Sequence, residues 1–169
     1  MRRVVIALAA AVCLVAPVVP SAESAPSVGP DALDIAGSKP RSTHTDRERH
    51  YQRRVFHWTN VARRNHGLPA FHRIPCLRRI AVRWSEHLAA SGDFEHQNLG
   101  IIFRRCDRSS SAGENIARGG ISPRQMVRFW MRSPDHRANI LNRDFTHLGV
   151  GTARRNGRWT GVQDFAGFS

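Results

Sequence analysis

Residues 133–141, Ser-Pro-Asp-His-Arg-Ala-Asn-Ile-Leu, constrain the fold more than any other stretch of this chain. They have the order of a helix start. Ser133 can cap the helix, Pro134 suits its first position, and Asp135 favours the positive end of the helix dipole. This order predicts a short helix that holds the imidazole of His136 rigidly in its first turn.

Two other segments carry polar residues that we expect to meet this helix. They are residues 113–116, Gly-Glu-Asn-Ile, and residues 94–96, Phe-Glu-His. We predict that His96, Glu114 and His136 converge on one polar, solvent-reachable cleft. The accessory residues expected there are Ser133, Asp135 and Asn115.

The first 25 residues have the layout of a secretory signal peptide. Two arginines precede the apolar run 4–15, which is too short to span a bilayer comfortably. An uncleaved membrane anchor is the alternative. Residues 26–44 are rich in Pro, Gly, Ser and Ala, and they predict a flexible linker. One domain, 45–169, then remains, and we expect it to be secreted and extracellular.

Three cysteines are present, and one of them, Cys13, lies in the predicted signal. The other two, Cys76 and Cys106, form an even number in an oxidising compartment, which predicts a disulfide. It would close a loop of about 30 residues and stabilise the fold by about 3 kcal/mol. Two buried free thiols are the alternative.

The formal net charge is +13, and 26 residues are Lys or Arg, almost all of them Arg. Such a surface attracts anionic polymers. Its arginines are scattered, however, and Trp58 and Trp84 lie on apolar helical stripes that predict core positions. We therefore expect no nucleic-acid partner.

The N-terminal half of the domain has helical patterns. Capping-box spacing at residues 45–48 predicts a helix with Tyr51 and Val55 on its buried stripe, and with Arg63 among its solvated charges. A second helix is predicted from Pro75 to Gly92. A loop is predicted over 97–112.

The C-terminal half mixes short elements. We expect a short strand at 113–117 and a third helix that opens at Ser122-Pro123. Asn156-Gly157 separates two alternating segments, 146–154 and 159–165, and predicts a hairpin. Helices followed by strands predict an α+β fold with an antiparallel sheet covered by helices.

In this order and at these spacings, the motifs resemble the CAP/SCP superfamily of cysteine-rich secretory, antigen 5 and pathogenesis-related proteins, and in particular its bacterial secreted branch. The matching segments are Phe94-Glu95-His96, Gly113-Glu114-Asn115-Ile116-Ala117, the stretch 133–141, Gly149-Val150-Gly151 and Gly161-Val162-Gln163-Asp164-Phe165. The resemblance covers about residues 50–166 and implies a CAP-like α-β-α sandwich around a central antiparallel sheet.

In many members of the family, two histidines and two acidic residues line a surface cleft. His96, Glu114 and His136 match three of the four positions. The fourth, three residues after Trp130, is Ser133 here, so one carboxylate is missing unless Asp135 substitutes. The resemblance also implies a divalent metal such as zinc, for which His96 and His136 would be ligands.

We expect a monomeric binding or interaction module whose ligand is a small molecule, a lipid, an envelope polymer or a protein. The alternative is a secreted hydrolase that uses the same cleft, either with a metal or with Ser133, His136 and Glu114 as a triad. A third interpretation gives these polar residues a purely structural role.

Overall fold

The structure, a computed structural model, describes residues 3–6 and 46–168. The strands are β1 (Arg3–Ile6), β2 (Ser109–Gly119), β3 (His147–Arg155) and β4 (Arg158–Phe168). The helices are α1 (Asp46–Asn65), α2 (Pro75–Ser91), α3 (Gly100–Arg105), α4 (Pro123–Arg132) and α5 (Pro134–Leu141).

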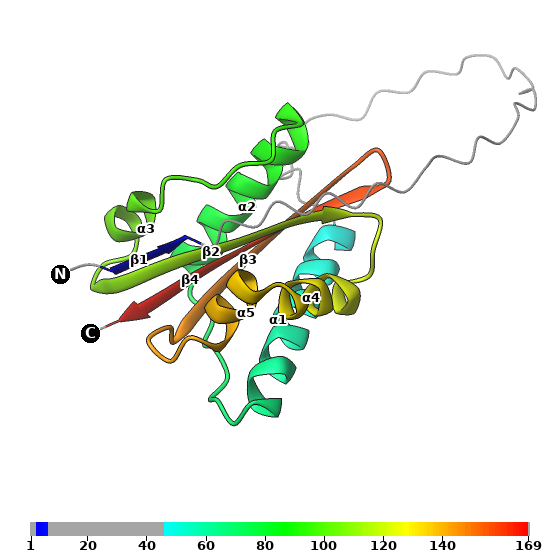
Figure 1. The fold of residues 1–169 in the computed structure, drawn as a ribbon. Helices are drawn as coiled ribbons and strands as arrows, with labels where there is room; N and C mark the ends of the chain where they lie inside the picture. The colour runs from blue at the N-terminus through cyan, green and yellow to red at the C-terminus, as the bar shows by residue number, and fades with distance from the viewer. Residues whose placement is uncertain (1–2, 7–45, 169) are drawn as a thin grey trace, which may run out of the picture.

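The strands form one sheet between two layers of helices (Figure 1). Their order is β1-β2-β4-β3, and β4 pairs antiparallel with both β2 and β3. Helices α2 and α3 cover one face, while α1, α4 and α5 cover the other. The predicted α+β class and α-β-α sandwich are therefore confirmed.

Two glycines let α2 lie directly on β3. A Cβ atom added at Gly149 would overlap the backbone of Leu77, and one at Gly151 would overlap the backbone of Ala81. No side chain fits between the strand and the helix at these positions. The Gly149-Val150-Gly151 motif thus fixes the distance between two layers, and it positions α2 over the sheet.

The C-terminal hairpin forms as the sequence predicts. Asn156 and Gly157 have φ angles of 48° and 74°, as a tight two-residue turn between right-twisted strands requires. The turn sets the register of β3 against β4, in which Gly149 pairs with Asp164.

The region predicted as the loop 97–112 is more ordered than expected. It contains α3, and the serine run at its end forms the start of β2 rather than a mobile loop. Ser109 and Ser111 are buried, and the Ser111 hydroxyl accepts a hydrogen bond from the backbone N–H of Gly167 at 3.1 Å. Pairing with β4, which the local sequence does not reveal, extends this strand.

Arg63 does not lie on a solvated face of α1, and that prediction was wrong. Its side chain is only 2% exposed. Its guanidinium group donates hydrogen bonds to four backbone carbonyls, those of Pro69, Ile140, Asn142 and Phe145. Two of these carbonyls belong to the C-terminal end of α5, where a helix leaves its acceptors unpaired. Arg63 therefore anchors the helix that carries His136.

Cys76 at the start of α2 and Cys106 at the end of α3 form the predicted disulfide, with Cα atoms 5.7 Å apart. Intact mass after alkylation should therefore show no added groups at these two residues without reductant, and two groups after reduction. Two added groups in the non-reduced, denatured protein would contradict the bridge.

The predicted domain boundaries stay predictions. The linker 26–44 and most of the predicted signal 1–25 lie outside the described residues. Within the signal, Arg3–Ile6 forms β1, which pairs in parallel with Ser111 to Glu114 of β2. Signal cleavage would remove this strand and leave that edge of β2 open.

Candidate functional site

Glu114 is the centre of a buried polar cluster. The antiparallel register places it on the same face of β2 as Ala112 and Ile116, which pack beneath α2 and α3. Its carboxylate is fully buried, and groups of His96 and Gln97 lie within hydrogen-bond distance of it. The carboxylate is therefore held as a hydrogen-bond acceptor inside the fold.

The donors come from the segment between α2 and α3. His96 places Nδ1 2.6 Å from Oε1 of Glu114, and Gln97 donates from its backbone N–H to the same oxygen at 3.2 Å. The Gln97 side-chain amide donates to Oε2 at 2.7 Å. The structure thus brings together two of the predicted site residues, His96 and Glu114, and adds Gln97.

Arg118 and Trp84 hold this segment in place. The Arg118 guanidinium donates to the carbonyls of Leu88, Gly92 and Asp93 at 2.5–2.8 Å, which ties the C-terminal end of α2 to β2. The indole N–H of Trp84 donates to the carbonyl of Glu95 at 3.2 Å. These bonds explain how an irregular segment presents His96 at a defined position.

Asp164 is a second carboxylate that the sequence analysis did not assign to the site. It pairs directly with Glu114 across β2 and β4. The Gln97 amide lies between the two and donates to Oδ1 of Asp164 at 2.8 Å as well as to Glu114. The available signal was a charged residue, Asp164, within the mostly apolar strand segment 161–166.

Burial, reinforced by the negative charge of Glu114, raises the pKa of Asp164 well above its usual range, and the Gln97 hydrogen bond opposes this only in part. Its Oδ2 atom is buried and has no partner among the described residues. Together these observations indicate that the fold favours the protonated form of Asp164, while Glu114 accepts from His96 and Gln97.

His136 lies in the opposite layer of the sandwich. It is 1% exposed, and its ring sits 6.3 Å from that of Phe129. Neither ring nitrogen has a hydrogen-bond partner within the described chain. Burial, and then the charge of His96, lower its pKa, although Asp135 opposes the shift. The structure therefore places His136 as a neutral buried imidazole that makes no hydrogen bond to Glu114.

Asn115 is buried and connects elements of the core, and its side chain is not exposed to a ligand at the surface. Its side chain points to the face of β2 opposite Glu114 and donates to the carbonyl of His136 and to Gln163, both at 3.0 Å. Asn139 of α5 donates in turn to Asn115, and Gln163 donates to Thr59 of α1. This buried chain of amides links α5, β2, β4 and α1. It gives a structural role to Asn115, Asn139 and Gln163, each of which lies in one of the sequence motifs.

The two remaining accessory residues lie near the surface. Asp135 is exposed and Ser133 is half-buried. Ser133 occupies the position before α5, but its side chain makes no capping hydrogen bond. Because both His136 nitrogens lack partners in the described part of the chain, Ser133 and His136 do not form the contact that a hydrolytic triad requires.

The residues do not fit the implied metal. In residues 3–6 and 46–168, no three His, Cys, Asp or Glu side chains are arranged to hold an ion. His96 directs Nδ1 to Glu114, and neither ring nitrogen of His136 makes a hydrogen bond within the described chain. We therefore derive no chemistry through zinc.

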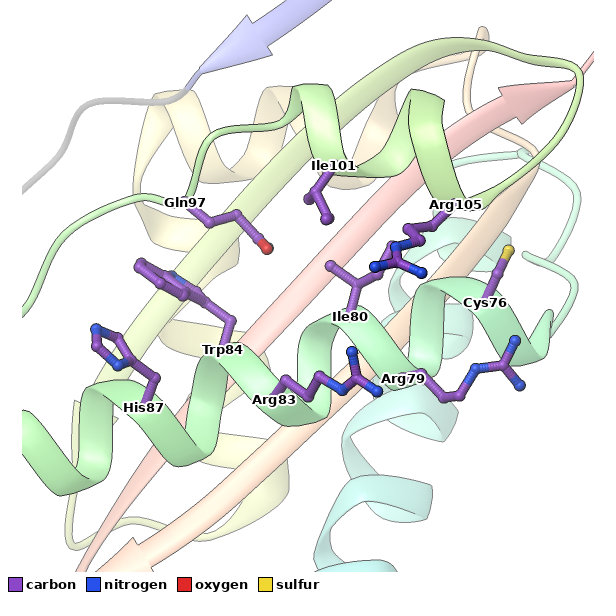
Figure 2. A pocket seen from close by; sticks show the side chains of 9 residues that line it. All are labelled: Cys76, Arg79, Ile80, Arg83, Trp84, His87, Gln97, Ile101 and Arg105. Atoms are coloured by element: carbon purple, nitrogen blue, oxygen red, sulfur yellow. The ribbon is translucent and has the colours of Figure 1, made fainter.

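Gln97 connects the buried cluster to a cavity between α2 and α3 (Figure 2). Trp84 also lines this cavity. It packs against the core on one side only, so its prediction as a core residue was incomplete. Trp58 is likewise only partly buried.

No helix in the described part of the chain is both long and apolar enough to cross a membrane.

A profile of the CAP, or cysteine-rich secretory protein, family matches residues 56–165. The chain is 34% identical over 129 residues to the uncharacterized protein YkwD of Bacillus subtilis (strain 168), covering 69% of this chain and 47% of YkwD. It is 32% identical over 110 residues to the uncharacterized membrane protein YlbC of the same bacterium, covering 62% of this chain and 32% of YlbC.

Among solved structures, an extracellular SCP-domain protein from Bacillus anthracis superposes with a TM-score of 0.65 at 27% identity, covering 77% of this chain and 45% of that one. An outer surface protein from Borrelia burgdorferi gives 0.64 at 17% identity, covering 71% and 94%, and so shows the shared fold. This chain spans half or less of the two Bacillus subtilis relatives. Since the profile matches 56–165, which holds the Glu114 cluster and both helix layers, the chain belongs to the CAP family.

Proposed function

We propose that this protein is a secreted CAP-domain binding module that recognises its ligand where His96 and Gln97 reach the surface. One observation carries the proposal. A buried carboxylate, Glu114, fixes both side chains, while the His96 side chain is still 19% exposed. A group held rigidly by a buried charge and open to solvent at its edge is suited to recognition.

The extracellular location is part of this proposal. It rests on the signal-like first 25 residues and on the disulfide, which persists in oxidising compartments. The Bacillus anthracis neighbour is described as extracellular and the Borrelia burgdorferi neighbour as an outer surface protein. Hydrolysis has less support, since no hydroxyl contacts either ring nitrogen of His136 within the described chain.

The test uses the full chain expressed with export from a bacterial host. Native mass spectrometry of the purified protein should show a bound molecule, together with an N-terminus that begins after residue 21, 22 or 24. The variant His96→Ala should lose most of the bound mass because the fixed imidazole is gone. His50→Ala, at an exposed position of α1, is the matched control and should retain it.

Equal retention of the bound molecule by His96→Ala and the parent would contradict the proposed recognition site. Turnover of ester or peptide substrates that His136→Ala abolishes would instead support the hydrolase. Each variant is first checked for an unchanged thermal unfolding midpoint, so that loss of binding is separated from loss of the fold.

A further inference from the structure

Two histidines from separate segments lie side by side at an edge strand of the sheet. His72 belongs to the connection between α1 and α2, and His147 is the first residue of β3, which ends the strand order. The two form a parallel β-bridge. The backbone N–H of His72 donates to the carbonyl of Thr146, and the N–H of Leu148 donates to the carbonyl of His72, both at 3.0 Å. Residues paired in this way direct their side chains to the same face, so the backbone holds the two imidazoles as neighbours.

The two imidazole rings have nearly the spacing that a shared metal ion requires. Their centroids are 5.5 Å apart, and their planes are inclined by 45°. Two imidazoles that bind one ion at metal–nitrogen distances of about 2.0–2.1 Å, with an angle of about 90–110° at the metal, have centroids about 4.5–5.2 Å apart. His72 is exposed to solvent, so its ring is able to turn by the small amount that closes this difference.

The ring of His147 is held in place by its surroundings. Thr146 Oγ1 lies 2.9 Å from Nδ1, and the ring of Phe168 packs against it edge-on, with centroids 4.6 Å apart. A hydroxyl that accepts from Nδ1–H leaves the lone pair of Nε2 for a metal. Burial, and then the charge of His72, lower the pKa of His147. The neutral imidazole that metal binding requires is therefore the main form at neutral pH.

We propose that His72 and His147 form a binding site for a late first-row divalent metal ion, with Cu²⁺ as the preferred ion. Two imidazole nitrogens occupy neighbouring coordination positions, and water fills the others. Imidazole suits copper, nickel and zinc, and affinity at a given nitrogen site is highest for Cu²⁺. A site with two protein ligands agrees with the finding that residues 3–6 and 46–168 contain no metal-binding cluster of three His, Cys, Asp or Glu. It shares no residue with the Glu114 cluster, so the proposal does not depend on the proposed function.

The test is titration of the tag-free exported chain with CuCl₂, combined with electron spin echo spectroscopy of the first equivalent bound. We expect one tightly bound Cu²⁺ per chain, with the signals of two coordinated imidazoles. His72→Gln and His147→Gln should each weaken its binding about tenfold or more, because attachment through two rings on one rigid frame is lost. His50→Gln is the matched control. It removes one exposed imidazole from α1 and should leave the binding unchanged.

Ion selectivity and folding are checked in the same proteins. Ni²⁺ and Zn²⁺ should bind more weakly than Cu²⁺, and Mg²⁺ should not compete, because Mg²⁺ prefers oxygen ligands. The thermal unfolding midpoint of each metal-free variant is compared with that of the parent. Because His72 is exposed, His72→Gln tests the site even if His147→Gln lowers this midpoint. Cu²⁺ binding like that of the parent in His72→Gln, or a single coordinated imidazole in the parent, would overturn the proposal.

Discussion

Replacing Arg63 with alanine is expected to lower the free energy of unfolding by about 3–5 kcal/mol, the largest loss among the substitutions considered. Arg63 donates to four backbone carbonyls at 2.7–3.4 Å, and its guanidinium lies 3.8 Å from the centre of the Phe71 ring. A buried acceptor left without a donor costs about 1–3 kcal/mol. Several such acceptors would be left at once, although removing a buried charge offsets part of the cost.

Urea unfolding of Arg63→Ala measures this loss, and Arg64→Ala is the matched control because its side chain is exposed on the next position of α1. The control should change stability by less than about 0.5 kcal/mol. Arg63→Lys keeps the charge but lacks the planar fork, so it should fall between the two. A loss below about 1 kcal/mol in Arg63→Ala would show that the four carbonyls find other donors.

What the sequence predicts well in this chain is local. Asn156-Gly157 specifies a tight turn through the φ angles that these two residues tolerate. Ser122 and Gln125 form a capping box at the start of α4, so that helix begins where the sequence indicates. Cys76 and Cys106 could be paired because two cysteines remain after the predicted signal, leaving one possible bridge.

What the sequence could not show depends on contacts between distant residues. Asp164 joins Glu114 only through the register of β2 against β4, which no local pattern reveals. Arg63 has the sequence appearance of a solvated helix charge, and only the carbonyls at the end of α5 explain its burial. The sequence predicts His136 beside Glu114 because both lie in strong motifs. In the structure these two motifs are joined by other residues, since Asn115 donates to the carbonyl of His136 and Asn139 donates to Asn115.

The site therefore divides between the two faces of β2. On one face, Glu114 and Asp164 hold Gln97 and His96. On the other, Asn115 binds the backbone of the helix that carries His136. Alternation of side chains along a strand makes this division unavoidable for neighbouring residues such as Glu114 and Asn115. The Gly-Glu-Asn motif thus joins the proposed recognition site on one face to helix placement on the other.

The second large effect concerns Asp164, whose replacement by asparagine should change how stability depends on pH. Burial and Glu114 raise the pKa of Asp164 in the folded protein, whereas in the unfolded chain it titrates near about 3.9. Above this pH the unfolded state therefore releases a proton that the folded state keeps. The folded state is destabilised as pH rises, by up to about 1.4 kcal/mol per pH unit, until pH exceeds the folded-state pKa.

Asp164→Asn removes this contribution. Its amide oxygen can still accept from Gln97, and its amide nitrogen takes the place of Oδ2, which has no partner among the described residues. We expect parent and variant to have similar stability near about pH 4, and the variant to gain by up to about 1.4 kcal/mol for each pH unit above that. Urea unfolding at about pH 4–8 measures the difference, with Asp107→Asn as an exposed control. Both proteins retain His136, so its titration cancels in the comparison. A difference that stays constant across this range would mean that Asp164 is ionised in the folded protein, and that Glu114 lies beside a second negative charge rather than beside a proton donor.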